Sequence, residues 1–348
     1  MKITKTVAAS PRGEIAIYTL TNASGAWVEL SALGAGINAI VVPDSAGNLE
    51  NVALGYANAA HYISDGPCMG KIPGRYANRI AGGKFTIDGV DYQLEINNGP
   101  NALHGGSEGF YNKIWDSEPT ESGVTFSLVS PDGDAGYPGT LTVKAAYTWS
   151  DDCQLSLNIT ATTDKTTVLN LTNHTYFNLA GEGSGSVLRH LLRLNCSKYL
   201  VTDENLTPTG EIAPVQGTPM DFTQAKPLGE DIRKPFPALA FGKGYDNCYA
   251  IDAYKKGELA LAAVLEDAHS GRTLEVLTTQ PAVQIYTGNW LSGCPATKSG
   301  NRTYFDYDGV AIECQGMPDA PNHPHFPSQQ LAPGEQYAHT IIFRFSTK

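Results

Sequence analysis

Short runs with strand character, separated by turn residues, make up most of this chain. The sequence contains 36 glycines and 21 prolines, and the runs between them alternate apolar with polar positions and favour β-branched and aromatic residues. The runs expected to form strands are Ala26–Leu30, Gly36–Val42, Val124–Val129, Leu141–Trp149, Gln154–Thr160, Leu274–Leu277, Val283–Tyr286, Val310–Cys314 and Thr340–Phe345. Only Ala57–Ser64 and Leu228–Lys234 could each hold a short helix. The pattern predicts an all-β protein, a large antiparallel β-sandwich.

One of these segments, Val168–Gly181 (VLNLTNHTYFNLAG), has an unusual polar pattern. In an extended strand alternate residues face the same side, so Asn170, Thr172 and His174 would share one face, opposite two leucines. A surface of amide, hydroxyl and imidazole groups suits a ligand made of hydroxyls. A half-exposed strand whose polar face meets water would show the same pattern.

Composition narrows the class of protein. The chain has 348 residues, with 41% hydrophobic and 17% charged residues, which is typical of a globular protein. Since all-β domains often exceed 200 residues, we expect one domain spanning residues 1–348. The net charge of −11 argues against nucleic acid and against an anionic membrane as partners. No run approaches the roughly 18 apolar residues of a membrane span.

The cysteines and the N-terminus indicate a cytoplasmic protein without bound metal. The six cysteines include no C-x-x-C spacing, so we expect free thiols in a reducing compartment. No secretory signal is visible in the first residues. His323 and His325 are close enough to suggest a metal, but no third ligand is apparent. The G-x-G-x-x-A of Leu33–Ala39 and the G-x-S-x-G of Gly105–Gly109 both lack the strand-then-helix context that a nucleotide site or a nucleophile elbow needs.

A carboxylate within an apolar strand is the strongest chemical signal. Glu313 interrupts the run VAIEC at Val310–Cys314, and a buried carboxylate is unfavourable unless it is paired or protonated. Burial would raise its pKa toward the range of a general base. A glutamate facing water at the end of a strand is the alternative interpretation.

Other polar candidates are spread along the chain. Gln284 and Tyr286 lie on the same face of one expected strand, and Tyr176, Tyr286 and Trp290 could pack against the apolar face of a ligand. Each of the remaining candidates also fits an ordinary surface or turn position when taken alone. They are Arg75, Asn78 and Arg79 in GRYANRIAGG, His104 in NNGPNALHGG and Asp246 in KGYDNCYAID.

Taken together, these segments resemble the aldose 1-epimerases, or galactose mutarotases. The matching text is GRYANRI, NALHGG, DGDAGYPG, NLTNHTYFNL, GYD, QIYTGNW, ECQGMPDAPNHPHFP and LAPGEQYAHTIIFRF. The matches follow the family's order over nearly the whole chain. The resemblance implies the galactose mutarotase-like β-supersandwich and interconversion of the α and β anomers of free aldohexoses such as galactose and glucose. It implies no cofactor, and a monomer or homodimer acting in hexose metabolism.

The resemblance also implies roles for individual residues. Glu313 would be the general base, His174 the general acid, and His104 would assist at the ring oxygen. The residues expected to hold sugar hydroxyls are Asn78, Arg79, Tyr176, Asp246 and Gln284, with Arg75 a weaker candidate. The sequence departs from the family at Asn247, where a histidine often follows the aspartate, and this leaves the preferred sugar open.

Three other functions remain compatible with the sequence. A non-catalytic sugar-binding protein could share the fold, although it would not require both His174 and Glu313. A hexose-phosphate epimerase would need additional cations at the cleft. A glycoside hydrolase would need two opposed carboxylates, for which Asp246 and Glu313 could serve.

Overall fold

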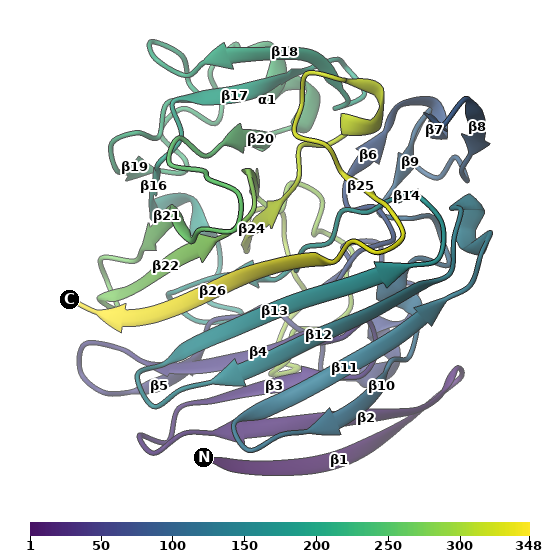
Figure 1. Cartoon of the computed structure of the whole chain (residues 1–348). Helices are drawn as coiled ribbons and strands as arrows, with labels where there is room; N and C mark the ends of the chain where they lie inside the picture. The colour runs from purple at the N-terminus through teal and green to yellow at the C-terminus, as the bar shows by residue number, and fades with distance from the viewer.

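The computed structural model describes all residues from 1 to 348 and confirms an all-β architecture of mostly antiparallel sheets (Figure 1). A nine-stranded sheet has the order β10-β11-β12-β13-β26-β22-β21-β16-β19, a six-stranded sheet the order β15-β24-β23-β20-β17-β18, and a five-stranded sheet runs β1 to β5. Three further pairs are β14-β25, β6-β9 and β7-β8.

The strand and helix bounds are as follows. The five-stranded sheet comprises β1 (Lys2–Ser10), β2 (Gly13–Thr21), β3 (Trp27–Ser31), β4 (Gly36–Pro43) and β5 (Leu49–Asn51). The nine-stranded sheet comprises β10 (Asp116–Pro119), β11 (Gly123–Ser130), β12 (Leu141–Trp149), β13 (Gln154–Thr163), β26 (Tyr337–Thr347), β22 (Arg272–Thr278), β21 (Ala260–Glu266), β16 (Leu191–Leu194) and β19 (Lys226–Pro227). The six-stranded sheet comprises β15 (Tyr176–Phe177), β24 (Val310–Gln315), β23 (Ala282–Tyr286), β20 (Asp246–Ala250), β17 (Lys198–Thr202) and β18 (Pro208–Pro214). The paired strands are β14 (Thr167–Val168), β25 (Gln330–Leu331), β6 (Arg79–Ile80), β9 (Ala102–Leu103), β7 (Lys84–Ile87) and β8 (Val90–Gln93). The helices are α1 (Pro237–Gly242) and six 3-10 turns, at Ala59–Tyr62, Ala81–Gly83, Phe110–Asn112, Asp134–Gly136, Val187–Arg189 and Ala320–Asn322.

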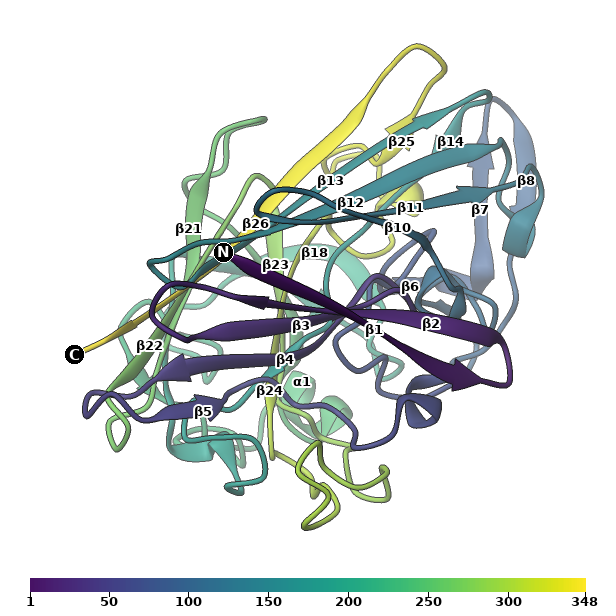
Figure 2. The same ribbon diagram turned by 90° about the horizontal axis from the view of Figure 1, so that it is seen from below.

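The main core lies against one face of the nine-stranded sheet. The five-stranded sheet packs on this face through Tyr18 of β2, whose ring centroid lies 6.2 Å from that of Phe126 in β11. The six-stranded sheet packs on it through Phe177 of β15, 5.2 Å from Phe343 of β26. Figure 2 shows the five-stranded sheet as a layer next to the strands β10 to β13. Alternation of buried and more exposed residues along β12 explains this packing, because one face of the strand is apolar.

The sequence predicted most of the long strands. All nine expected runs fall within or overlap observed strands, and Leu141–Trp149 coincides with β12. Within Ala57–Ser64 the structure forms a short 3-10 helix at Ala59–Tyr62. The helix expected at Leu228–Lys234 is wrong, since this segment consists of turns. Helix α1 begins just afterwards at Pro237, where the fixed φ of proline suits a first helical turn.

The expectation that the polar part of Val168–Gly181, with Asn170, Thr172 and His174, forms a strand is also wrong. Only Thr167–Val168 and Tyr176–Phe177 are strands, and the intervening residues cross the interior between them. Asn170, Thr172 and His174 are at most 4% exposed, so they do not form a polar face toward water. Here hydrogen bonds with distant segments replace the regular pairing of a sheet.

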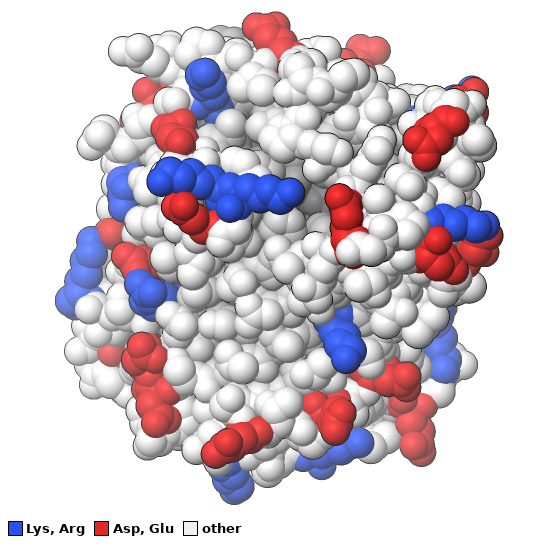
Figure 3. Space-filling view, viewed as in Figure 1, with Lys and Arg blue, Asp and Glu red and all other residues white.

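On the face seen in Figure 3, lysine and arginine are interspersed with aspartate and glutamate, so this face has no large patch of one charge. No helix of the structure has the length and apolar character needed to cross a membrane.

Candidate active site

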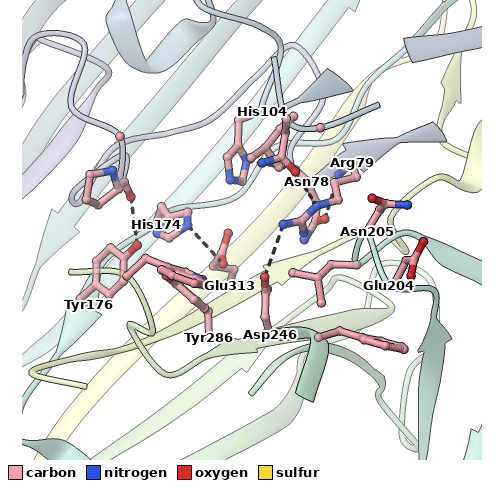
Figure 4. Close-up of a pocket in the computed structure, with 18 residues that line it drawn as sticks. Asn78, Arg79, His104, His174, Tyr176, Glu204, Asn205, Asp246, Tyr286 and Glu313 are labelled. Carbon is pink, nitrogen blue, oxygen red and sulfur yellow. Dashed lines mark hydrogen bonds and ion pairs between the residues drawn. The ribbon is translucent and has the colours of Figure 1, made fainter. Parts of the chain in front are cut away.

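The six-stranded sheet forms one wall of a polar cleft of about 530 Å³ (Figure 4). Four of its strands supply the wall: β24 carries Glu313, β20 carries Asp246, β15 carries Tyr176 and β23 carries Tyr286. Loops around β6 and β9 supply the opposite side. Seven of the nine residues chosen from the sequence line this cleft, namely Asn78, Arg79, His104, His174, Tyr176, Asp246 and Glu313.

His174 and Glu313 meet at the bottom of the cleft. Nε2 of His174 lies 3.5 Å from Oε1 of Glu313, and their side chains are 5% and 2% exposed. Burial lowers the pKa of His174 to about 4, with the nearby Asp246 carboxylate acting in the opposite direction. Burial, followed by the charge of Asp246, raises the pKa of Glu313 well above its usual value. Both shifts favour an uncharged pair.

His104 presents one defined nitrogen to the cleft. The backbone N–H of Asn78 donates to Nδ1 of His104 at 3.1 Å, so the proton of the neutral ring must reside on Nε2. Burial, the neighbouring His174 and Arg79 hold the pKa of His104 well below its usual value. The two imidazole rings meet edge to face, with centroids 5.4 Å apart. His104 is therefore arranged as a neutral hydrogen-bond donor.

Asp246 is fixed by two donors. Nε2 of Gln284 donates to its Oδ1 at 2.6 Å, and Nη2 of Arg79 to its Oδ2 at 3.5 Å. Arg79 in turn donates from Nε to Oδ1 of Asn98 at 3.0 Å. Gln284 pairs with Glu313 across β23 and β24. It does not line the cleft, so its contact is with the carboxylate of Asp246.

Two residues chosen from the sequence use their polar atoms elsewhere. The structure places Arg75 outside the cleft, where its guanidinium donates to the backbone oxygens of Pro138 and Gly139 at 2.8 and 2.9 Å. The expectation that Arg75 holds a sugar hydroxyl is corrected accordingly, because its donors serve the interior of the protein. Tyr176 lines the cleft with its ring, but its hydroxyl donates to the backbone oxygen of Pro67 at 3.1 Å.

The outer part of the cleft contains residues that sequence reasoning missed. Asn98, Glu204, Asn205 and Phe241 all line it. Glu204 and Asn205 come from a loop without a recognisable motif, and Phe241 comes from helix α1. Asn98 lies within NNGPNALHGG, where residue type alone does not distinguish it from its neighbours. Trp290, which the sequence suggested as a sugar-packing residue, lies at the mouth and is 62% exposed.

The other candidate chemistry does not form a second centre. The ring Nε2 atoms of His323 and His325 lie 3.2 and 2.8 Å from the backbone oxygens of Pro208 and Gly210. No three His, Cys, Asp or Glu side chains gather as a possible metal site. All six cysteines are free thiols.

Comparison with known proteins identifies the family. Residues 16–344 match the family model for aldose 1-epimerase. The chain is 44% identical to galactose mutarotase of Sus scrofa over 92% of its own length and 91% of that protein. It is 37% identical to aldose 1-epimerase of Escherichia coli over 99% of both chains.

The chain belongs to the aldose 1-epimerase family.

Solved structures agree with this assignment. An aldose epimerase homologue from C. elegans superposes with a TM-score of 0.87 at 30% identity, covering 99% of both chains. Galactose 1-epimerase from Lactobacillus acidophilus gives a TM-score of 0.86 at 27% identity, covering 100% of this chain and 99% of the other. These matches confirm the predicted galactose mutarotase-like fold. Membership in the aldose 1-epimerase family confirms the predicted enzyme class, an isomerase of carbohydrate metabolism.

Proposed function

We propose that this aldose 1-epimerase interconverts the α and β anomers of free aldohexoses, galactose and glucose among them, with Glu313 and His174 exchanging protons with the sugar. The observation that carries the proposal is the contact of the two buried side chains in a polar cleft, with Nε2 of His174 3.5 Å from Oε1 of Glu313. The names of the relatives in pig and Escherichia coli, galactose mutarotase and aldose 1-epimerase, point to the same substrates.

Ring opening requires one base and one acid. Glu313 as carboxylate removes the proton from the anomeric hydroxyl, and His174 as imidazolium gives a proton to the ring oxygen. The C1–O5 bond breaks, and the sugar becomes an open-chain aldehyde. Rotation about C1–C2 presents the other face of the aldehyde. Closure returns each proton by the reverse route, so the pair ends as it began.

The pKa shifts fit this cycle because the pair shares one proton. In the charged form the proton is on His174, and in the uncharged form it is on Glu313. Burial favours the uncharged form, which is the state that ring opening produces and from which closure starts. The two residues therefore exchange the roles of acid and base during each turnover.

The remaining residues of the cleft bind and orient the sugar. Nε2–H of His104 is a neutral donor suited to the ring oxygen. Asp246, held by Gln284 and Arg79, accepts hydrogen bonds from hydroxyls. Asn78 and Arg79 donate, and the rings of Tyr176 and Tyr286 cover the apolar face of the sugar.

The alternatives fit the cleft less well. A phosphosugar would need free cations, yet Arg79 is the one Lys or Arg lining the cleft and already contacts Asp246. A glycosidase needs carboxylates on opposite sides of the bond to be cleaved. Asp246 and Glu313 instead lie on one face of the same sheet, with β23 between their strands.

Polarimetry on freshly dissolved α-galactose and α-glucose tests the proposal. The protein should speed the decay of rotation without changing its final value, and Glu313→Ala should abolish the acceleration. If the wild-type protein left the rate of this decay unchanged, the proposed reaction would be refuted. Saturable sugar binding without acceleration would instead support a binding protein.

A further inference from the structure

A buried ion pair lies beside the main chain of His174, outside the lining of the cleft. Nζ of Lys71 contacts Oδ1 of Asp65, and their side chains are 1% and 2% exposed. Neither residue belongs to the aldose 1-epimerase pattern from which the site was chosen. Because two charges are rarely buried together without a role, their surroundings are informative.

The segment between these two residues holds His174 by both of its backbone groups. The backbone N–H of His174 donates to the oxygen of Lys71 at 2.9 Å. The N–H of Gly70 donates to the oxygen of His174, also at 2.9 Å. In addition, Nδ2 of Asn173 donates to the oxygen of Gly70 at 2.8 Å. Residues 65–71 thus determine where the main chain of His174 lies.

The same segment fixes the ring that packs against His174. The backbone oxygen of Pro67 accepts a hydrogen bond from the hydroxyl of Tyr176 at 3.1 Å. The ring of Tyr176 lies 4.9 Å from the imidazole of His174, centroid to centroid. Gly66 and Pro67 also line the cleft. Any shift of this segment would therefore move the imidazole and its supporting ring together.

The ion pair closes the segment into a compact loop. Oδ2 of Asp65 accepts the backbone N–H of Met69 at 2.8 Å, while Nζ of Lys71 donates to the oxygen of Tyr62 at 2.5 Å. Lys71 also lies over the ring of Tyr111, 5.2 Å from its centroid. The two side chains consequently tie the ends of the loop to each other and to the preceding 3-10 turn.

His174 lacks the support that usually orients a proton-transferring histidine. In most such sites the second ring nitrogen bonds to a carboxylate or a carbonyl, which fixes the ring. Here Nδ1 of His174 is buried and forms no hydrogen bond with any other residue. The orientation must come from its backbone and from ring packing, and both depend on residues 65–71.

We propose that the buried Asp65–Lys71 pair is a positioning device that holds His174 in place for proton transfer. This inference rests on the proposed function of His174. Asp65 and Lys71 are positioning residues rather than catalytic ones, since they act through the loop and through the charge of Lys71. Stability alone does not require the pair, because replacing both partners of a buried ion pair by neutral groups is often neutral or stabilising.

The charge of Lys71 provides a readout that a purely structural role would not change. The ammonium of Lys71 lowers the pKa of His174, whereas Asp246 raises it and burial is the largest cause of the overall decrease. Removing the ammonium should therefore raise the pKa of His174 and move the acid limb of kcat to higher pH. The titratable and charged groups near the imidazole are Glu313, Asp246, Tyr176, Tyr286, His104, Arg79, Lys71, Asp65 and Cys68.

The test is the double variant Asp65→Asn/Lys71→Met. The two new side chains are close in shape to the original ones, and the variant leaves no unpaired charge. We expect kcat for galactose to fall at least tenfold and its acid limb to move to higher pH. KM should stay within about twofold, because the hydroxyl-binding residues Arg79 and Asp246 belong to other segments. The matched control is Lys255→Met/Glu258→Gln, an ion pair whose side chains are 73% and 67% exposed, which should behave as wild type.

A folded double variant with wild-type kcat and acid limb would overturn the inference, while leaving the proposed function intact if the wild type is active. An inactive wild type would instead refute the proposed function. If the double variant fails to fold, Tyr176→Phe is the second test, since it removes the bond between the loop and the ring beside His174. Its kcat should fall several-fold, and an unchanged kcat would exclude a positioning role for the loop.

Discussion

At the scale of single residues, the site depends on two groups that share one proton in a buried environment. The same burial moves the pKa values of His174 and Glu313 in opposite directions, because in each case it disfavours the charged form. For a reaction that transfers a proton out and back, an acid and a base of similar strength are advantageous.

Glu313→Gln and His174→Asn should each lower kcat about 10²–10⁴-fold, the usual contribution of a positioned acid or base. Glu313→Gln preserves side-chain volume, so its thermal unfolding should shift little, whereas His174→Asn shortens a buried side chain and should lower the unfolding temperature modestly. The rates are measured by polarimetry with galactose. Glu258→Gln, at an exposed carboxylate, is the control and should retain full activity. Activity near that of the wild type in either variant would contradict the assigned roles.

The rate should remain high well below the usual pKa of histidine. Activity requires one proton on the His174–Glu313 pair, and it is lost when a second proton binds His174, whose pKa burial lowers to about 4. At high pH the proton is lost only above the raised pKa of Glu313. A pH profile of kcat/KM should thus show its acid limb near pH 4. An acid limb near 6.5 would show that His174 is not held in the way the structure indicates.

Asp246→Ala should mainly raise KM, because Asp246 accepts sugar hydroxyls while its loss leaves the proton-transfer pair in place. Gln284→Leu should raise KM less, since it removes one of the two donors that hold Asp246. Initial rates measured over a range of galactose concentrations give KM and kcat separately for each variant. An unchanged KM for Asp246→Ala would exclude its role in binding.

The sequence identified most of these residues but could not separate neighbours within a motif. Arg75 and Arg79 both belong to GRYANRI, yet Arg79 faces the cleft and Arg75 bonds to backbone oxygens of the interior. By residue type and by position in the motif, either arginine could bind a sugar hydroxyl. The direction of each side chain depends on distant segments, such as Pro138 and Gly139, which no local pattern specifies.

At the scale of elements, strand register places side chains next to each other more reliably than local pattern does. The pairing of Gln284 with Glu313 and of Asp246 with Tyr286 puts these four residues on one face. The sequence predicted that β23 and β24 are strands, but it did not specify their register. The segment that holds His174 illustrates the opposite case: its polar alternation resembled a strand, whereas tertiary hydrogen bonds take the place of a sheet.

The loop that carries His104 depends on a glycine. Gly105 has φ +85°, and a Cβ there would lie 2.1 Å from the oxygen of Gly74, so Gly105→Ala should displace the loop. We expect a clear loss of thermal stability and of activity. Gly89→Ala is the control, because Gly89 has a similar φ of +78° with no atom within 4 Å of the added Cβ. The free energy of unfolding of the control should decrease by only about 1–2 kcal/mol, which is the penalty for an alanine in a left-handed conformation. Equal effects of the two changes in calorimetry would rule out the clash.

At the scale of the whole molecule, the core is built from segments far apart in the sequence. Strand β13 pairs with β26, joining Gln154 to Arg344. Local alternation predicts that such strands exist and that they form a sandwich, but it does not specify partners separated by so many residues. The family resemblance supplied that information in the sequence interpretation, and the physical pattern alone reached only the fold class.

Acid stability tests this core at a position outside the cleft. His190 is 2% exposed, and its Nε2 accepts the backbone N–H of Leu179 at 2.9 Å. Burial lowers its pKa to about 4, while the unfolded chain has the ordinary value near 6.5. Between these values the unfolded state binds more protons, so the free energy of unfolding should decrease as the pH falls from 6.5 to 4. The contribution of His190 is at most roughly 3 kcal/mol.

His190→Gln should remove this contribution, since an amide oxygen can accept the same N–H but does not bind a proton in this range. Urea unfolding at pH 7 and pH 4.5 should therefore show a smaller loss of stability in the variant than in the wild type. His61→Gln, at an exposed histidine, should lose as much stability as the wild type. If all three proteins lost the same free energy on acidification, protonation of His190 would not limit the acid stability of the core. The decrease would then have to come from other buried groups with lowered pKa values, of which His174 and His339 are the remaining histidines with a pKa of about 4.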